Sequence, residues 1–264
     1  MNHTNGKVII VGYHQIVPSG SAMRYALKKS DLERQIRWLK ENDFRIMSLA
    51  DLLRVLHDPA AFPRKGAVFT FDDCLDCHFE VVVPALREFG YTGCFFAPVG
   101  LIGKKGYLNW EQLGEMARQG MEVGSHGFSH DLLDTMPKER LTRELKDSKE
   151  ILEKRLRTRC DLFSVPRGYY NRNILRAAEE AGYSAVCTSK FGFVRCGASS
   201  MSLPRFVPKK DQTFDEFTGI VSGDTMNGFR IKSLELLYAT VRKVIGSSAY
   251  ERIRRNIFKE DYRY

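Results

Sequence analysis

The chain has 264 residues, of which 43% are hydrophobic and 28% are charged, and it carries a formal net charge of +9. A chain of this length and apolar content can bury one sizeable core, so collagen-like, disordered and disulfide-scaffold proteins are excluded. No run of apolar residues is long enough to cross a bilayer.

Short apolar segments alternate with amphipathic segments along most of the chain. The apolar segments predict strands over residues 7–13, 66–71, 92–98, 121–124, 162–166 and 184–188. The amphipathic segments predict helices over residues 31–39, 49–56, 79–89, 110–118, 137–156 and 171–181. Ser30 and Glu33 form a capping-box pattern before the first helix, and Ser48 precedes the second.

This alternation is typical of βαβ units, in which right-handed crossovers join parallel strands. The fold class is therefore α/β. We expect the strands to close into a (β/α) barrel or partial barrel, and an open doubly wound sheet is the alternative.

The last part of the chain differs in character from the rest. From about residue 223 it contains no clear strand and ends in one or two basic amphipathic helices. We therefore expect a main domain over residues 1–222 and a helical extension over residues 223–264. The basic residues of this extension include Arg252, Arg254, Arg255 and Lys259. With the aromatic residues among them, they are suited to contact an anionic membrane surface, and a solvated helix face is the alternative. No nucleic-acid signature is present, so no nucleic acid partner is expected.

The N-terminus and the cysteines indicate the compartment. Residues 1–7 are polar and lack the basic-then-apolar layout of a secretion signal, which predicts a cytoplasmic protein. The six cysteines are then interpreted as reduced thiols. Cys74 and Cys77 form a C-x-x-C pattern, but no second pair completes a zinc site, so we expect Cys74 only to fill a turn.

Polar side chains fall directly after several predicted strands, where a parallel barrel would bring them to one face. Asp72 and Asp73 follow the second strand, His126 follows the fourth, and His130 comes four residues later. Two histidines and one carboxylate make a metal-binding set that leaves positions open for water and substrate. A second carboxylate beside the set can act as a general base. An Asp-Asp pair alone is more often a helix cap, and a His-x-x-x-His pair alone is more often a surface feature of a helix. The combination of the two after predicted strands predicts a hydrolase.

Two of these stretches resemble the motifs of a known family. Residues 67–73, Ala-Val-Phe-Thr-Phe-Asp-Asp, resemble the T-F-D-D-G motif of the polysaccharide deacetylases, also called the carbohydrate esterase 4 or NodB-homology family. Residues 126–130 match the H-[ST]-x-x-H motif in spacing and in both histidines, with Gly127 in place of Ser or Thr. Further similarity lies in residues 108–113 and 120–126.

The resemblance implies a deformed (β/α) barrel that binds a divalent metal and acts on an N-acetylated glycan. By position, Asp73, His126 and His130 would hold the metal. The metal is commonly zinc, although cobalt, nickel and iron also suit this set of ligands. Asp72 would act as the general base that takes a proton from the attacking water.

The chain departs from the family in its third motif. Ser164 stands where an arginine usually orients the general base, and Arg167 is a candidate to supply the missing charge. The resemblance also places the backbone of Arg167 at the oxyanion, with Tyr169 beside the substrate. At the end of the first motif, Cys74 replaces the usual glycine, and a cysteine fits that turn.

A further departure concerns the general acid. Many members carry a histidine for this role in a late L-x-H motif, but no histidine follows His130 here. The poly-N-acetylglucosamine deacetylase branch resembles this chain more closely, because its acid histidine lies in an N-terminal Tyr-His-x-Ile segment. Tyr13-His14-Gln15-Ile16 matches that segment, so His14 is the expected general acid. A purely structural histidine is the alternative.

The sequence therefore favours an N-deacetylase acting on an amino-sugar glycan. An O-acetyl esterase on the same site and a catalytically silent carbohydrate-binding protein are the alternatives. Asp72 argues against a catalytically silent protein, because a binding protein needs no base beside a metal. Ser164 in the position of the usual arginine mildly favours a silent protein.

Overall fold

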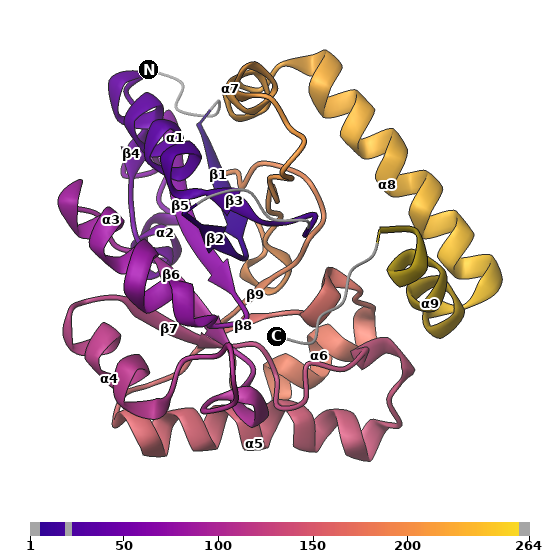
Figure 1. The fold of residues 1–264 in the computed structure, drawn as a ribbon. Coiled ribbons are helices and arrows are strands. Elements are labelled where there is room, and N and C mark those ends of the chain that lie inside the picture. Colours follow the sequence, from indigo (N-terminus) through magenta and orange to yellow (C-terminus); the bar gives the residue numbers. More distant parts are fainter. Residues whose placement is uncertain (1–5, 19–22, 259–264) are drawn as a thin grey trace.

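The computed structural model describes residues 6–18 and 23–258, and its centre is a curved sheet of seven parallel strands (Figure 1). In spatial order the strands are β1 (Lys7–Tyr13), β5 (Lys65–Asp72), β6 (Cys94–Ala97), β7 (Glu122–Ser125), β8 (Leu162–Ser164) and β9 (Ala185–Cys187), and β4 (Arg45–Ile46) pairs with the start of β5. Two short strands, β2 (Ile16–Val17) and β3 (Leu27–Lys28), pair separately.

Helices connect successive strands and surround the sheet (Figure 1). They are α1 (Lys29–Glu41), α2 (Leu49–Val55), α3 (Val83–Glu88), α4 (Trp110–Arg118), α5 (Lys138–Leu156) and α6 (Arg172–Glu180). A π-helical turn (His78–Val82) leads into α3, and short 3-10 turns occupy Val99–Leu101, Leu133–Thr135, Pro166–Gly168 and Ser200–Ser202. The predicted alternation of strands and helices is confirmed.

An irregular segment closes the sheet into a deformed barrel. Leu203 donates its backbone N–H to Val186 of β9 at 2.8 Å, and Phe206 donates to Ile10 of β1, also at 2.8 Å. Residues 203–206 therefore occupy the gap between the two edge strands, where a regular strand would complete the barrel. The predicted (β/α) barrel is confirmed, in its deformed form.

Alternate residues of the strands face two buried layers. On β5, Phe69 and Phe71 belong to the cluster packed under the helices, whereas Val68 belongs to a second cluster. Thr70 and Asp72 follow Val68 at intervals of two and are buried on the same side. This register turns the carboxylate of Asp72 into the barrel at the carboxyl end of the strand.

One of the two predicted helix caps, at Ser48 and Ser30, is present in the structure. Ser48 caps α2, because its hydroxyl accepts the N–H of Asp51 at 3.0 Å. The capping box at Ser30 is wrong, since α1 begins at Lys29 and its N-cap, Lys28, makes no side-chain bond. Lys28 also belongs to β3, so the strand runs directly into the helix and Ser30 falls within the first turn.

The predicted C-terminal extension contains two described helices, α8 (Thr225–Ile245) and α9 (Ser247–Phe258), which stand beside the carboxyl ends of the strands (Figure 1). A further helix, α7 (Phe214–Ser222), precedes the extension and was not predicted. None of the described helices combines the length and the apolarity that a membrane span requires. All six cysteines are free thiols.

Close packing against Gly124 provides a test of the barrel interior. A Cβ atom on this β7 residue would lie 2.6 Å from the ring of Phe96 and 2.9 Å from the carbonyl oxygen of Leu162. We expect Gly124→Ala to lower the free energy of unfolding by about 1–3 kcal/mol, measured by urea denaturation. Gly114→Ala on α4 is the control, since its nearest neighbour would be Arg118 at 3.6 Å. That change should be neutral or stabilising, and equal losses in both variants would contradict the packing argument.

Candidate active site

Three side chains from two strand ends meet in a buried cluster. Asp73 follows β5, His126 follows β7, and His130 lies in the loop after β7. Asp73 Oδ1 lies 3.1 Å from His130 Nε2 and 3.6 Å from His126 Nε2. One donor atom from each residue lies within 4.8 Å of the other two, so the three could hold one ion.

The backbone around this cluster is held in an unusual conformation. Asp73 and His130 both have positive φ, at 78° and 63°, which non-glycine residues rarely adopt. A buried carboxylate on α5 supports the histidine loop: Glu144 Oε1 accepts the N–H of Phe128 at 2.7 Å and the hydroxyl of Ser129 at 3.0 Å. These bonds hold His130 in position despite its strained backbone.

The protonation state of His126 suits a metal ligand. Its Nδ1–H donates to the carbonyl oxygen of Ser164 at 2.8 Å, which leaves Nε2 facing Asp73. Burial lowers the pKa of His126 to about 4, so the imidazole is neutral near pH 7. A neutral imidazole with a fixed tautomer beside a carboxylate and a second imidazole fits a divalent cation.

Asp72 is not part of this cluster but forms a two-pronged ion pair with Arg205. Nη1 and Nη2 of Arg205 donate to Oδ1 and Oδ2 of Asp72 at 2.8 and 2.7 Å. Arg205 is buried and also donates to the hydroxyl of Ser164 at 2.9 Å and to the carbonyl of Thr188 at 2.9 Å. Burial alone would raise the pKa of the Asp72 carboxyl, but the charge and the hydrogen bonds of Arg205 hold it well below its usual value. Asp72 is therefore an oriented, ionised carboxylate.

His14 is a further neighbour of Asp72. Its Nε2 is 3.9 Å from Asp72 Oδ2, and its ring stacks on Tyr25 with centroids 5.1 Å apart. His78 fixes the backbone here through a 2.7 Å bond between its Nε2 and the carbonyl of His14. Burial lowers the pKa of His14, whereas the carboxylates of Asp72 and Asp73 oppose that effect.

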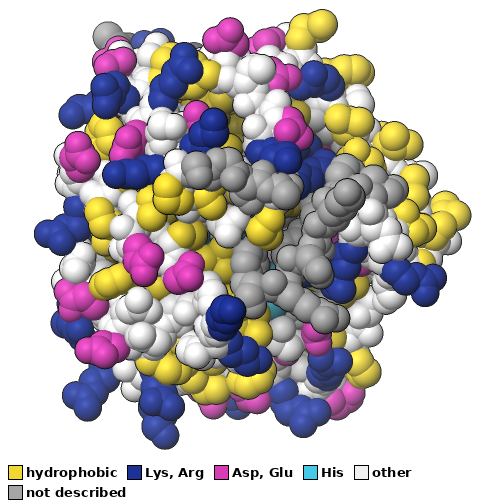
Figure 2. Space-filling view, viewed as in Figure 1, with side chains coloured by type: hydrophobic (Ala, Val, Ile, Leu, Met, Phe, Trp, Pro, Cys, Tyr) yellow, Lys and Arg dark blue, Asp and Glu magenta, His cyan; other side chains and the backbone are white. Residues whose placement is uncertain are grey.

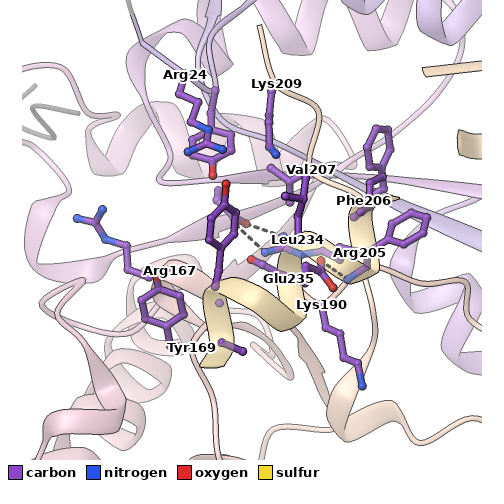
Figure 3. Close-up of a pocket in the computed structure, with 18 of the residues that line it drawn as sticks. Arg24, Arg167, Tyr169, Lys190, Arg205, Phe206, Val207, Lys209, Leu234 and Glu235 are labelled. Atoms are coloured by element: carbon purple, nitrogen blue, oxygen red, sulfur yellow. Dashed lines mark hydrogen bonds and ion pairs between the residues drawn. The ribbon is translucent and has the colours of Figure 1, made fainter. Parts of the chain in front are cut away.

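These groups line a pocket of about 690 Å³ that residues of α8 and α9 also line. Figure 3 shows part of this lining, including Leu234 and Glu235 of α8. Arg167 and Tyr169 line the pocket and contact α9. Tyr169 donates to the buried Glu251 at 2.7 Å, and Arg167 Nη1 lies 3.7 Å from the same carboxylate. The cation beside Asp72 is therefore Arg205, and the side chain of Arg167 faces Glu251.

The fold and this site agree with comparisons to known proteins. Residues 60–186 match the family model described as polysaccharide deacetylase. This match covers just under half of the chain. Residues 67–73, which resemble the first motif of that family, lie within the matched segment.

Several curated proteins are similar to this chain. It is 29% identical over 186 residues to YxkH of Bacillus subtilis (strain 168), covering 70% of this chain and 66% of that protein. It is 21% identical over 276 residues to the poly-beta-1,6-N-acetyl-D-glucosamine N-deacetylase of Escherichia coli (strain K12), and the match covers 87% of this chain and 41% of that protein. The enzyme of that name from Staphylococcus aureus (strain MSSA476) is 26% identical over 185 residues, covering 64% and 61%. The chain thus spans less than two thirds of the length of these relatives.

Solved structures with this fold include two deacetylase-like proteins. Streptococcus pyogenes deacetylase PplD, in complex with acetate, superposes with a TM-score of 0.75 at 24% identity, covering 81% of this chain and 98% of that one. IcaB from Ammonifex degensii superposes with a TM-score of 0.73 at 22% identity, covering 82% and 96%. Both similarities support the deformed barrel as the fold of this chain.

Arg205 is the site residue that the sequence analysis missed. It stands in Leu203-Pro204-Arg205, which has the L-x-H spacing of the family's late motif with arginine in place of histidine. Ser164, which replaces the usual arginine of the third motif, contacts Arg205 through its hydroxyl. The signal was therefore present in the late motif, but only a search for arginine rather than histidine would have found it.

We expect Arg205→Lys to lower the rate of acetate release about 10- to 100-fold, because one ammonium cannot bond both oxygens of Asp72 in the geometry of a guanidinium. The KM and the metal content should stay close to those of the wild type, since Arg205 contacts the candidate base Asp72 rather than the candidate metal cluster. Arg159→Lys, at a side chain that is 85% exposed, is the control. An unchanged kcat in Arg205→Lys would mean that the ion pair serves only stability.

Proposed function

We propose that this protein is a metal-dependent hydrolase that removes N-acetyl groups from the amino sugars of a glycan. The observation that carries the proposal is the oriented Asp72 carboxylate beside the Asp73, His126 and His130 cluster in one pocket. The names of the Escherichia coli and Staphylococcus aureus relatives, both N-deacetylases of poly-beta-1,6-N-acetyl-D-glucosamine, favour an N-acetylated glycan as substrate.

Asp73, His126 and His130 would hold the cation, and zinc suits one carboxylate and two imidazoles. When bound, such a cation lowers the pKa of a water molecule and polarises a carbonyl group. Because the donor atoms belong to strand ends and a supported loop, little rearrangement is needed to bind it. The narrow spacing of Asp73 Oδ1 and His130 Nε2 favours an ion over a bulky group at this point.

In the proposed reaction, Asp72 and His14 each carry out one proton transfer. Asp72 takes a proton from the attacking water, whose oxygen bonds to the acetamide carbon. The carbon–nitrogen bond then breaks as His14 donates a proton to the nitrogen, giving acetate and a free amine. His14 must be charged at that moment. Burial lowers its pKa, and the carboxylates of Asp72 and Asp73 offset only part of that effect.

Arg167 and Tyr169 are proposed to act on the substrate side of the pocket. The turn Pro166–Gly168 gives Arg167 a positive φ of 61° and Gly168 one of 72°. In the proposal, which follows the resemblance to the family, the backbone N–H at Arg167 stabilises the developing oxyanion. Tyr169 presents an aromatic ring at the wall of the same pocket.

The decisive experiment measures acetate release from N-acetylated glucosamine oligomers. Wild-type protein should release acetate, a chelator should abolish the release, and zinc should restore it. Asp72→Asn should keep its metal content and lose most activity, because it removes the base while preserving the shape. Release from O-acetylated sugars alone would identify an esterase, and no release from either substrate would favour a binding protein.

His14 has a separate test, since an acid matters most for a poor leaving group. We expect His14→Ala to retain its metal and to lose amide hydrolysis by about 10²- to 10⁴-fold. An acetate ester with a good leaving group needs no protonation, so its hydrolysis should fall much less. Equal losses on amide and ester would remove His14 from the role of general acid.

We also propose that the C-terminal extension contacts an anionic membrane surface from the cytoplasmic side. Met226, Phe229, Leu237, Val241 and Val244 recur at helical spacing on α8 and are 40–79% exposed. Figure 2 shows hydrophobic side chains along the outer edge of this helix. Lys243, Arg252 and Arg255 are also exposed, whereas Arg254 lines the pocket and Lys259 lies outside the described residues. An apolar stripe with basic neighbours is typical of an interfacial helix, and the free thiols suit a reducing compartment.

Vesicle co-sedimentation tests this surface. We expect binding to vesicles that contain phosphatidylglycerol, weaker binding at high salt, and none to neutral phosphatidylcholine vesicles. Val244→Asp should reduce the binding, because it places a charge in the apolar stripe. Salt-insensitive binding, or dimerisation through α8 without any lipid binding, would contradict the proposal.

A further inference from the structure

The pocket above the candidate metal cluster is strongly cationic. Among the described residues that line it, lysine and arginine outnumber aspartate and glutamate by eight to three. The cations are Arg24, Arg167, Lys190, Arg205, Lys209, Lys232, Arg242 and Arg254. Asp72 matches Arg205, and Glu251, which lies behind the pocket wall, pairs with Arg254 and lies 3.7 Å from Arg167. With Glu251 included, the cations still outnumber the carboxylates, and the excess lies outside the reaction centre. A pocket built only for a neutral sugar polymer does not need this excess.

Two of the cations, Arg24 and Arg254, lie against Tyr25, although they come from distant parts of the chain. The guanidinium carbons of Arg24 and Arg254 lie 5.7 and 5.8 Å from the Tyr25 ring centroid, and Arg254 donates to its hydroxyl at 3.2 Å. Figure 3 shows Arg24 and Lys209 entering the pocket from the same side. Burial lowers the pKa of Lys209 and the charges of Arg24 and Arg254 lower it further, whereas the charge of Glu235 opposes them. Glu251 also pairs with Arg254. The repulsion among the three cations is therefore only partly offset, and an anion placed among them would relieve the remainder.

The cation cluster of Arg24, Lys209 and Arg254 lies close to the reacting groups. Tyr25 is in contact with the cluster on one side and stacks on His14 on the other, with ring centroids 5.1 Å apart. His14 in turn lies 3.9 Å from Asp72. The ring of Tyr25 thus separates the cation cluster from His14, the proposed general acid. A group bound at the cluster and an acetamide beside Asp72 can therefore belong to the same sugar.

We propose that the cation cluster binds a phosphate or diphosphate group carried by the amino sugar whose acetamide is hydrolysed. The inference rests on the proposed function and names its substrate class. In a 2-acetamido sugar, the anomeric carbon adjoins the carbon that carries the acetamido group, so an anomeric phosphate would enter the pocket beside the acetamide. Guanidinium groups bind phosphate through paired hydrogen bonds, and the lysine adds a point charge.

A binding measurement tests the subsite directly. We expect N-acetylglucosamine 1-phosphate to bind the metal-loaded wild-type protein about tenfold or more tightly than N-acetylglucosamine, measured by calorimetry. Lys209→Gln should lose most of that advantage and bind the neutral sugar as before. Lys146→Gln on α5, at a side chain that is 62% exposed, is the control. Lys209 is chosen because Arg254 also pairs with Glu251, so its replacement would disturb the wall of the pocket.

Failure of the phosphate subsite and failure of the proposed deacetylase function give different results in these measurements. A phosphate that bound only through the metal would bind wild type and Lys209→Gln equally, and this result would overturn the cation subsite. Equal affinity of the wild-type protein for the phosphorylated and neutral sugars would overturn it too. If no substrate released acetate, the proposed function would fail, and the calorimetry would still decide whether the subsite exists.

Rate measurements then identify the source of the phosphate. Acetate release is compared for UDP-N-acetylglucosamine, a polyprenyl-diphosphate-linked N-acetylglucosamine in detergent micelles, and a neutral N-acetylglucosamine hexamer. A higher kcat/KM on either diphosphate, lost in Lys209→Gln, supports the inference and tells a soluble donor from a lipid-linked one. A preference for the hexamer that is unaffected by Lys209→Gln would leave the deacetylase in place and remove the anionic subsite.

Discussion

Two parallel hydrogen bonds join the carboxylate of Asp72 to the guanidinium of Arg205, and both side chains are almost fully buried. Loss of either partner would leave an unmatched charge inside the barrel, which costs about 3–5 kcal/mol. Arg205 lies on the irregular segment that closes the gap between β9 and β1. The closure of the barrel and the orientation of the candidate base are therefore produced by the same segment.

Ser164 connects this ion pair to the candidate metal cluster. Its backbone carbonyl accepts from His126 at 2.8 Å, and its hydroxyl accepts from Arg205 at 2.9 Å. The residue that departs from the family's third motif thus contacts both halves of the site. A serine is short enough to leave room for the guanidinium, which comes from the closing segment next to β9. The missing arginine of one motif and the arginine in place of the late histidine are two parts of one rearrangement.

The sequence predicted much of this arrangement because parallel strands bring their carboxyl ends together. Asp72, Asp73 and His126 each follow a strand that apolar patterning marks clearly, and His14 follows β1 in the same way. Arg205 could not be found by this rule, because the closing segment has no strand periodicity and its pairing partners lie far away in the sequence. The start of α1 was misplaced for a related reason, since the pairing of β2 with β3 is a tertiary contact. Roles in catalysis stay predictions, because position alone does not establish a proton transfer.

The two faces of α8 could not be predicted from its composition, yet they link the proposals about substrate and surface. Glu235 and Arg242 line the pocket on one face, while Phe229 and Val244 are exposed on the opposite face. A helix that rests on a membrane by its apolar stripe would thus place its other face, and the cationic pocket behind it, next to the headgroup layer. Lipid-linked sugar phosphates occupy that layer, and there the cation cluster would meet a diphosphate without extracting the lipid chain. The same helix would then both recruit the enzyme and complete its pocket, so contact with the surface and entry of the substrate would share one structural element.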